Sequence, residues 1–110
     1  MQTTIRSLQP QDQKAWRALW TAYLEFYETS VPEEVYQATF ARLIDPDNTR
    51  QNALLAVRGE TPLGLVHYIY HPHNWRIEDV CYLQDLYADP SVRGTGVGRA
   101  LIEAVYEAAD

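Results

Sequence analysis

The chain has 110 residues, which suits a single domain over 1–110. Its formal net charge is −6 and its pI is about 4.9, which argues against a nucleic-acid partner because such proteins normally carry a basic face. An acidic surface is compatible with a cationic small-molecule substrate, although solubility alone explains the acidity of many proteins. The single cysteine, Cys81, excludes an intrachain disulfide and indicates a reducing compartment. No run approaches the roughly 20 apolar residues of a membrane span, and Met1–Pro10 lacks a signal sequence, so we expect a soluble cytoplasmic protein without a membrane partner.

Residues 3–8 predict a short strand with Ile5 as its apolar anchor, and Pro10 suits the first turn of a helix. Apolar residues then recur at spacings of three and four, which predicts an amphipathic helix. Its stripe consists of Trp16, Leu19, Trp20, Tyr23, Leu24 and Tyr27. Because these side chains fall on a single face, we expect them to belong to the core rather than to a base-stacking platform.

A second helix is predicted after Ser30, which forms a potential capping box with Glu33. It ends near Asp45-Pro46, because the residue before proline disfavours the helical region. The side chains expected to face inward are Val35, Thr39, Phe40 and Leu43.

Three strands follow, over residues 53–57, 63–70 and 80–88, separated by turn-forming residues at 58–62 and 71–74. A last helix starts at about Gly96, and its apolar face consists of Leu101, Ile102, Val105, Tyr106 and Ala109. We therefore read Tyr106 as a packing residue. The order β-α-α-β-β-β-α predicts a mixed α+β fold. No helix stop follows, and such a helix usually leads to a parallel strand, so we expect the fold to be incomplete at its C-terminus.

The joint between the third strand of this run and the last helix is rich in glycine. It reads Arg93-Gly94-Thr95-Gly96-Val97-Gly98-Arg99. Glycines let successive backbone amides converge on an anion, and the helix N-terminus adds partial positive charge, so a diphosphate is the expected ligand. The spacing fits neither the P-loop nor the dinucleotide fingerprint. A glycine-rich turn without a ligand is the alternative interpretation.

The pattern Arg93-x-x-Gly96-x-Gly98 resembles the Q/R-x-x-G-x-G/A motif of the GNAT superfamily of N-acetyltransferases, and the order of elements is similar over essentially the whole chain. The resemblance implies that acetyl-CoA is the co-substrate and that no metal is needed. It assigns the pyrophosphate to Arg93, Gly94, Thr95, Gly96, Val97, Gly98 and Arg99. It assigns the pantetheine arm to the backbone of Leu86, Tyr87 and Ala88.

Within the superfamily, the sequence looks similar to the polyamine and diamine acetyltransferase branch. The matching residues are Gly64, Tyr68, Tyr70, Pro72, Trp75 and Leu83-Gln84-Asp85-Leu86-Tyr87. That branch carries glutamate where this chain has Gln84, and glutamine cannot act as a base. Asp85 is then the nearest acidic candidate for a base, a water relay or an ammonium ligand, with a solvated carboxylate as the alternative. Strand alternation predicts that Gln84 and Asp85 face opposite sides, so that only one reaches the substrate.

The family chemistry is direct attack of an amine on the thioester, for which a backbone amide near Leu86 or Tyr87 is the candidate oxyanion donor. Glu28 and Gln84 are the candidate substrate residues. Glu28 belongs to a group of acidic residues, Glu25, Glu28, Glu33 and Glu34, around the junction of the first two helices, which in the family borders the acceptor site. The family's usual general acid, a later tyrosine, has no equivalent here.

The three histidines, His67, His71 and His73, fit turn or surface positions better than a metal site. The leading hypothesis is acetylation of a small cationic amine. Acetylation of a peptide or protein is a second hypothesis, and a non-catalytic acyl-CoA-binding or assembly module is a third. Without a fifth strand the edge of residues 80–88 needs a partner, so we expect either a longer protein or a homodimer.

Overall fold

The structure, a computed structural model, describes residues 3–109. Its strands are β1 (Thr3–Ser7), β2 (Gln51–Arg58), β3 (Thr61–His71) and β4 (Val80–Ala88). Its helices are α1 (Gln13–Phe26), α2 (Glu33–Ile44) and α3 (Val97–Ala109), with short 3₁₀ turns η1 (Pro10–Asp12) and η2 (Pro90–Val92). The predicted order of elements and the mixed α/β class are confirmed. The β2–β3 turn is shorter than predicted, because Thr61 and Pro62 already pair with β2.

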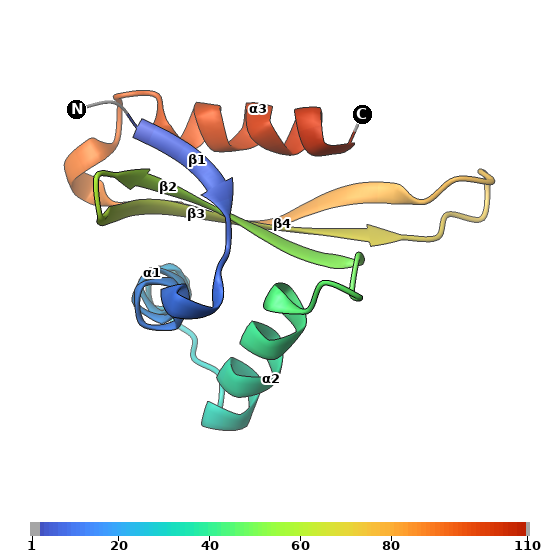
Figure 1. Cartoon of the computed structure of the whole chain (residues 1–110), viewed down its shortest axis with the longest axis horizontal. Helices are drawn as coiled ribbons and strands as arrows, with labels where there is room; N and C mark the ends of the chain where they lie inside the picture. The colour runs from blue at the N-terminus through green and yellow to red at the C-terminus, as the bar shows by residue number, and fades with distance from the viewer. Residues whose placement is uncertain (1–2, 110) are drawn as a thin grey trace.

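The four strands form one antiparallel sheet in the order β1-β2-β3-β4. Helices α1 and α2 cover one face of the sheet and α3 covers the other, as Figure 1 shows. The side chains of β2 alternate accordingly: Ala53, Leu55 and Val57 pack with α1 and α2, whereas Leu54 and Ala56 pack with α3. Two buried faces explain why residues 53–57 of this strand are all apolar.

The stripe of α1 is only partly buried. Trp16, Leu19, Trp20 and Leu24 lie in the core, as predicted. Tyr27, which the pattern assigned to the same stripe, is 62% exposed because α1 ends at Phe26 and the chain leaves the helix there. In α3, Tyr106 is likewise exposed rather than packed, because the face of α3 that contacts the sheet consists of Val97, Leu101 and Val105.

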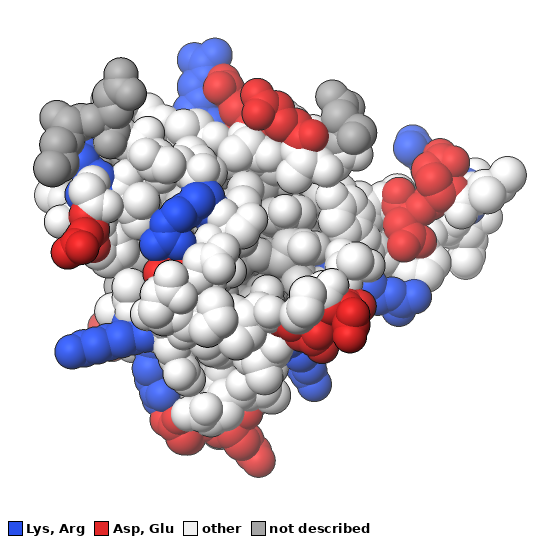
Figure 2. Space-filling view, in the orientation of Figure 1, with Lys and Arg blue, Asp and Glu red and all other residues white. Residues whose placement is uncertain are grey.

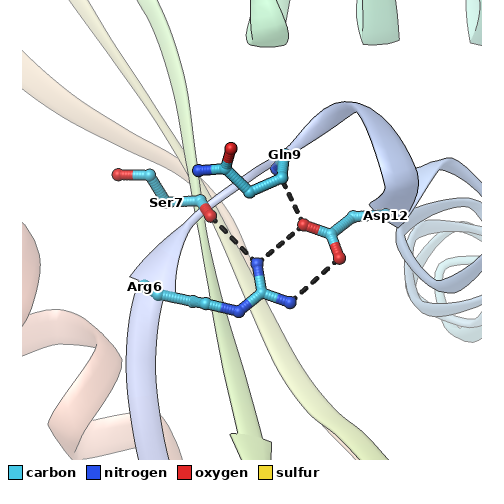
Figure 3. Close-up of polar contacts among 4 residues, drawn as sticks. All are labelled: Arg6, Ser7, Gln9 and Asp12. Atoms are coloured by element: carbon cyan, nitrogen blue, oxygen red, sulfur yellow. Dashed lines mark hydrogen bonds and ion pairs between the residues drawn. The ribbon is translucent and has the colours of Figure 1, made fainter. Parts of the chain in front are cut away.

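An ion pair fixes the path from β1 into α1 (Figure 3). The Arg6 guanidinium donates from Nη1 to Asp12 Oδ2 at 2.7 Å and from Nη2 to Asp12 Oδ1 at 2.9 Å. The backbone N–H of Gln9 donates to the same Asp12 Oδ2 at 2.7 Å. The hydrogen bond from Arg6 is the main reason that the pKa of Asp12 lies below its ordinary value. The buried Asp12 thereby gains the partners that a buried carboxylate needs.

The predicted capping box at Ser30 is wrong. The residue at the N-terminal boundary of α2 is Pro32, without a side-chain cap. Glu33 instead accepts hydrogen bonds from Arg17 of α1 and from Gln37, so it joins α1 to α2. Just before, Glu28 has a φ of 56°, and Thr29 N donates to Leu24 O at 3.0 Å, which is the Schellman closure of α1.

None of the described helices has the length and apolar character needed to cross a membrane. Figure 2 shows acidic and basic side chains in small separate groups on one face of the molecule, with mostly uncharged residues at its centre.

Candidate functional site

The glycine-rich loop has the backbone that the sequence predicts for it. Gly94 and Gly96 have φ values of 86° and 93°, in the region that side chains other than glycine rarely adopt. Helix α3 begins at Val97, directly after these residues. The buried side chains of Val92 and Val97 anchor the two ends of the loop in the core. The exposed backbone of the loop therefore lies at a helix N-terminus, the position in which proteins commonly bind anions.

A hollow of about 230 Å³ lies beside this loop; we call it the loop-side hollow. Helix α1 contributes Tyr23, Phe26 and Tyr27, strand β4 contributes Leu86, Tyr87 and Ala88, and the loop contributes Arg93 and Gly98. Five of the residues predicted to bind acetyl-CoA thus lie around one cavity. The other five predicted residues, Gly94, Thr95, Gly96, Val97 and Arg99, do not line it. The exposed Arg99 donates instead to Glu103 at 3.0 Å.

Arg93 closes one side of the loop-side hollow. Its Nε donates to the Ala88 carbonyl oxygen at 3.0 Å. Its guanidinium carbon lies 5.6 Å from the ring centre of Tyr87 and 5.9 Å from that of Phe26. Arg93 therefore connects the loop to the end of β4 and carries positive charge into the hollow.

Strand β4 is the edge of the described sheet and pairs only with β3 there. The Asp89 amide donates to the Leu63 carbonyl of β3 at 2.8 Å. Because backbone groups alternate in direction along a strand, the amide of Tyr87 also points toward β3, and those of Leu86 and Ala88 point to the open edge. Of the two predicted oxyanion donors, only the Leu86 amide faces away from the sheet.

Strand β4 contains a bulge at Gln84. His67 pairs with Asp85 and Tyr68 pairs with Leu83, so Gln84 is an extra residue between them. The prediction that Gln84 and Asp85 face opposite sides is therefore wrong. The bulge interrupts the alternation, and both side chains line the same cavity on the α1–α2 face.

This second cavity, which we call the helix-side hollow, has a volume of about 330 Å³. Its lining is Trp20 and Leu24 of α1, Val31, Val35, Thr39 and Leu43 from the α1–α2 junction and α2, and Gln51, Asn52, His67, Ile69, Gln84 and Asp85 of the sheet. The junction of α1 and α2 thus borders this cavity. Glu28 is exposed and is not among the lining residues.

A buried polar chain ends at Asp85. The Trp16 indole Nε1 donates to His67 Nε2 at 2.9 Å, and His67 Nδ1 lies 2.8 Å from Asp85 Oδ2. His67 is 4% exposed, so its expected turn or surface position is wrong. The motif search missed it because its partners come from α1 and β4, far away in the sequence.

The ionisation of Asp85 follows from its surroundings. Burial raises the pKa of Asp85, but the hydrogen bond from His67, with smaller contributions from Tyr23 and Trp20, outweighs burial and lowers it below the ordinary value. Burial and the nearby Asp85 charge raise the pKa of Tyr23 to about 12. At neutral pH the site therefore holds a carboxylate next to a protonated phenol.

The remaining candidates lie elsewhere. Glu25 and Glu34 are exposed, and Glu33 is bound to Arg17. Within residues 3–109 no three His, Cys, Asp or Glu side chains gather as metal ligands would.

The model of the "Acetyltransferase (GNAT) family" matches residues 16–110. The chain belongs to this family. A curated relative, the D-amino-acid N-acetyltransferase HPA3 of Saccharomyces cerevisiae, is 44% identical over 108 residues, which cover 96% of this chain and 66% of the relative. The chain thus spans slightly less than two thirds of the length of that relative.

Solved structures of low sequence identity share the fold. The aminoglycoside N-acetyltransferase AAC(6')-Iy, in complex with a bisubstrate analogue of CoA, superposes with a TM-score of 0.81 at 20% identity over 97% of this chain and 71% of its own. A ribosomal-protein-alanine N-acetyltransferase from Brucella melitensis biovar Abortus 2308 gives 0.81 at 20% identity, over 99% and 72% of the two chains.

Proposed function

We propose that this protein transfers the acetyl group of acetyl-CoA to a small primary amine. The observation that carries the proposal is the adjacency of two cavities along β4. Residues 86–88 line the loop-side hollow, and Gln84 and Asp85 line the helix-side hollow. A thioester bound in the first cavity and an amine bound in the second would meet at the bulged segment of β4.

In this proposal the backbone amides of Gly94, Gly96, Val97 and Gly98 bind the pyrophosphate, and Arg93 adds a charge-assisted contact. The Thr95 amide takes no part, because it donates to the Val92 carbonyl oxygen at 3.1 Å. The pantetheine arm lies along the open edge of β4, where the backbone groups of Leu86 and Ala88 face outward. Acetyl-CoA is the cosubstrate that supplies the activated acyl group. The residues named here bind it and exclude water from its thioester.

The amine nitrogen attacks the thioester carbonyl carbon, the carbon–sulfur bond breaks, and the nitrogen loses a proton while the thiolate gains one. The Leu86 amide is positioned to donate to the oxyanion. The lowered pKa of Asp85 makes it a weak base, because proton transfer is most efficient when the pKa lies near the working pH. We therefore assign Asp85 to holding the ammonium and the water that removes its proton.

The lining of the helix-side hollow favours an acceptor with one ammonium group and a compact, largely apolar body. Asp85 is the one carboxylate among the described lining residues, and apolar side chains of α1 and α2 surround it. A polyamine would need an acidic partner outside this cavity, for which Glu28 is the candidate. An amino acid, the acceptor for which the yeast relative is named, would place its carboxylate among the amide side chains of Gln51, Asn52 and Gln84.

The first test is a titration with acetyl-CoA followed by thermal unfolding, with NAD and ATP as controls. A ligand at 100 times its dissociation constant stabilises the native state by about 2.7 kcal/mol, which is a readily measured shift. Stabilisation by acetyl-CoA but not by the controls is expected. Equal shifts with all three ligands, or none, would contradict the assignment of the loop.

Turnover is then measured as thiol release from acetyl-CoA, with spermidine, D- and L-amino acids and a basic peptide as acceptors. We expect amines with a single ammonium group to react fastest. Acetylation of the peptide alone would overturn the small-amine proposal.

Self-association is also part of the proposal, because among the described residues the edge of β4 before the bulge, residues 80–83, pairs only with β3 and offers backbone groups to a second copy away from the pantetheine arm. Sedimentation at micromolar concentration is expected to show a dimer, and a single monomeric species would contradict this.

A further inference from the structure

The hydrogen bonds that link Trp16, His67 and Asp85 have a fixed direction from donor to acceptor. The indole Nε1 of Trp16 can only donate, so His67 Nε2 must accept and carries no proton. The remaining proton of a neutral imidazole then sits on Nδ1, which donates to Asp85 Oδ2. All three groups lie in the interior: Trp16 is 0% exposed, and the side chain of Asp85 is 16% exposed.

A doubly protonated imidazole does not fit this arrangement, because Nε2–H would face the indole N–H in a buried site with neither donor satisfied. The other groups facing the chain do not compete for its protons. Tyr23 of α1 is a protonated phenol whose pKa is about 12. The lining residues from α2 and β2 are Val35, Thr39, Leu43, Gln51 and Asn52, none of which is titratable.

Two separate features of the fold assemble the hydrogen-bonded group of Trp16, His67 and Asp85. The bulge at Gln84 brings Asp85 opposite His67 on the α1–α2 face. The ring of Trp20 lies 5.4 Å from that of His67 in an edge-on arrangement, which holds the imidazole from its other side. The hydrogen bond to His67 uses the Oδ2 atom of Asp85, and Asp85 also lines the helix-side hollow, where a ligand can reach its carboxylate.

We propose that His67 is a positioning residue for acetyl transfer. Trp16 fixes its imidazole as a neutral donor at Nδ1, and this donor keeps the Asp85 carboxylate ionised and directed at the acceptor amine. The inference rests on the proposed function, because it deepens the role of Asp85 in the same site.

Two substitutions of His67 separate the donor to Asp85 from the acceptor for Trp16. In His67→Asn the amide nitrogen lies near the place of Nδ1, so it can still donate to Asp85 but does not reach Trp16. In His67→Gln the amide group lies near the place of Nε2, so its oxygen can accept from Trp16 but the donor to Asp85 is lost. Each variant keeps one of the two hydrogen bonds of His67 and loses the other. The two variants therefore disturb the core to a similar extent and serve as controls for each other.

The acceptor with the highest turnover in the panel above is used to measure kcat and KM. His67→Gln is expected to lower kcat about tenfold, the effect of one lost hydrogen bond to a charged group, with the KM for acetyl-CoA unchanged. His67→Asn is expected to lose less. The acid limb of the pH profile should move to higher pH in His67→Gln, because a carboxylate that loses its donor is protonated more easily. Equal kcat values and equal pH profiles in the two variants would overturn the proposal.

Two NMR measurements need no turnover. The ¹³C titration of the Asp85 carboxyl group should move to higher pH in His67→Gln but not in His67→Asn. The imidazole ¹⁵N signals of the unsubstituted protein should show Nδ1 protonated and Nε2 unprotonated. In Trp16→Phe, Nδ1 should keep its proton because Asp85 still accepts it, and Nε2 should become free to take up a proton. A protonated Nε2 in the unsubstituted protein, or an Asp85 titration that neither substitution moves, would refute the inference. If acetyl-CoA does not bind and no amine reacts, the proposed function fails, and these signals still decide what His67 does to Asp85.

Discussion

Alanine substitutions at two glycines of the loop should have opposite effects on stability. Gly96 has a φ of 93°, whereas Gly98 is the second residue of α3 and has no positive φ. A Cβ atom added at either position meets no other atom within 4 Å, so steric crowding does not distinguish the two sites. Only the backbone conformation does.

The expected magnitudes follow from that difference. Gly96→Ala forces an L-residue into a positive-φ conformation, which costs about 1–2 kcal/mol. Gly98→Ala replaces glycine in a helix with the best helix former and stabilises by up to about 1 kcal/mol. For a chain of this size the two melting temperatures should differ by on the order of 10 °C.

Urea denaturation and thermal unfolding of both variants without ligand measure this difference. Gly96→Ala should also lose most of the stabilisation by acetyl-CoA, because its loop amides no longer point to one place. If the two variants unfold at the same temperature, or Gly98→Ala is the less stable one, the reasoning from backbone conformation is wrong.

Three further predictions concern the fold around the site. Gly64→Ala would place a Cβ atom 3.0 Å from the Tyr87 carbonyl oxygen, which the pairing of β4 with β3 holds in place. The free energy of unfolding should therefore fall by about 1–3 kcal/mol in urea denaturation. An unchanged denaturation midpoint would contradict this. Asp12→Asn should cost about 1–2 kcal/mol at neutral pH. The folded pKa of Asp12 is lowered, so the stability that its carboxylate contributes is present above the ordinary value of 3.8 and is lost as the pH falls through the folded pKa. Asp12→Asn should therefore lose less stability on acidification than the parent protein. Parallel acid-denaturation curves for the two proteins would disprove this prediction. Glu28→Gly should stabilise α1 by up to about 1 kcal/mol because glycine suits the φ of 56°. Reduced turnover of spermidine in this variant would support Glu28 as a substrate residue, and unchanged turnover would exclude it.

The order of elements and the glycine-rich loop could be predicted from the sequence, because both depend on neighbours in the chain. The stripe of α1 has a period that only a helix satisfies, and α2 ends before Pro46 because proline restricts the residue in front of it. Gly94 and Gly96 supply the two positive φ values of this loop. The motif around them is typical of the family and depends on no contact between distant segments.

The ends of the helices were less predictable. Ser30 and Glu33 have the spacing of a capping box, yet Arg17 of the preceding helix binds Glu33, and this contact depends on how α1 and α2 cross. Tyr27 continues the apolar stripe by its spacing but lies beyond the last turn of α1, where it stays largely exposed.

By itself the sequence determined the chain's elements, its glycine-rich loop and its family, since periodicity, proline and glycine act over a few residues. Only the tertiary structure decided how Asp85 is placed and ionised. One extra residue at Gln84 turns Asp85 to the α1–α2 face, and the hydrogen bonds that link it to His67 and Trp16 span three elements. No local pattern encodes such a chain, because its energy depends on distances between segments that are set only when the sheet and helices pack together.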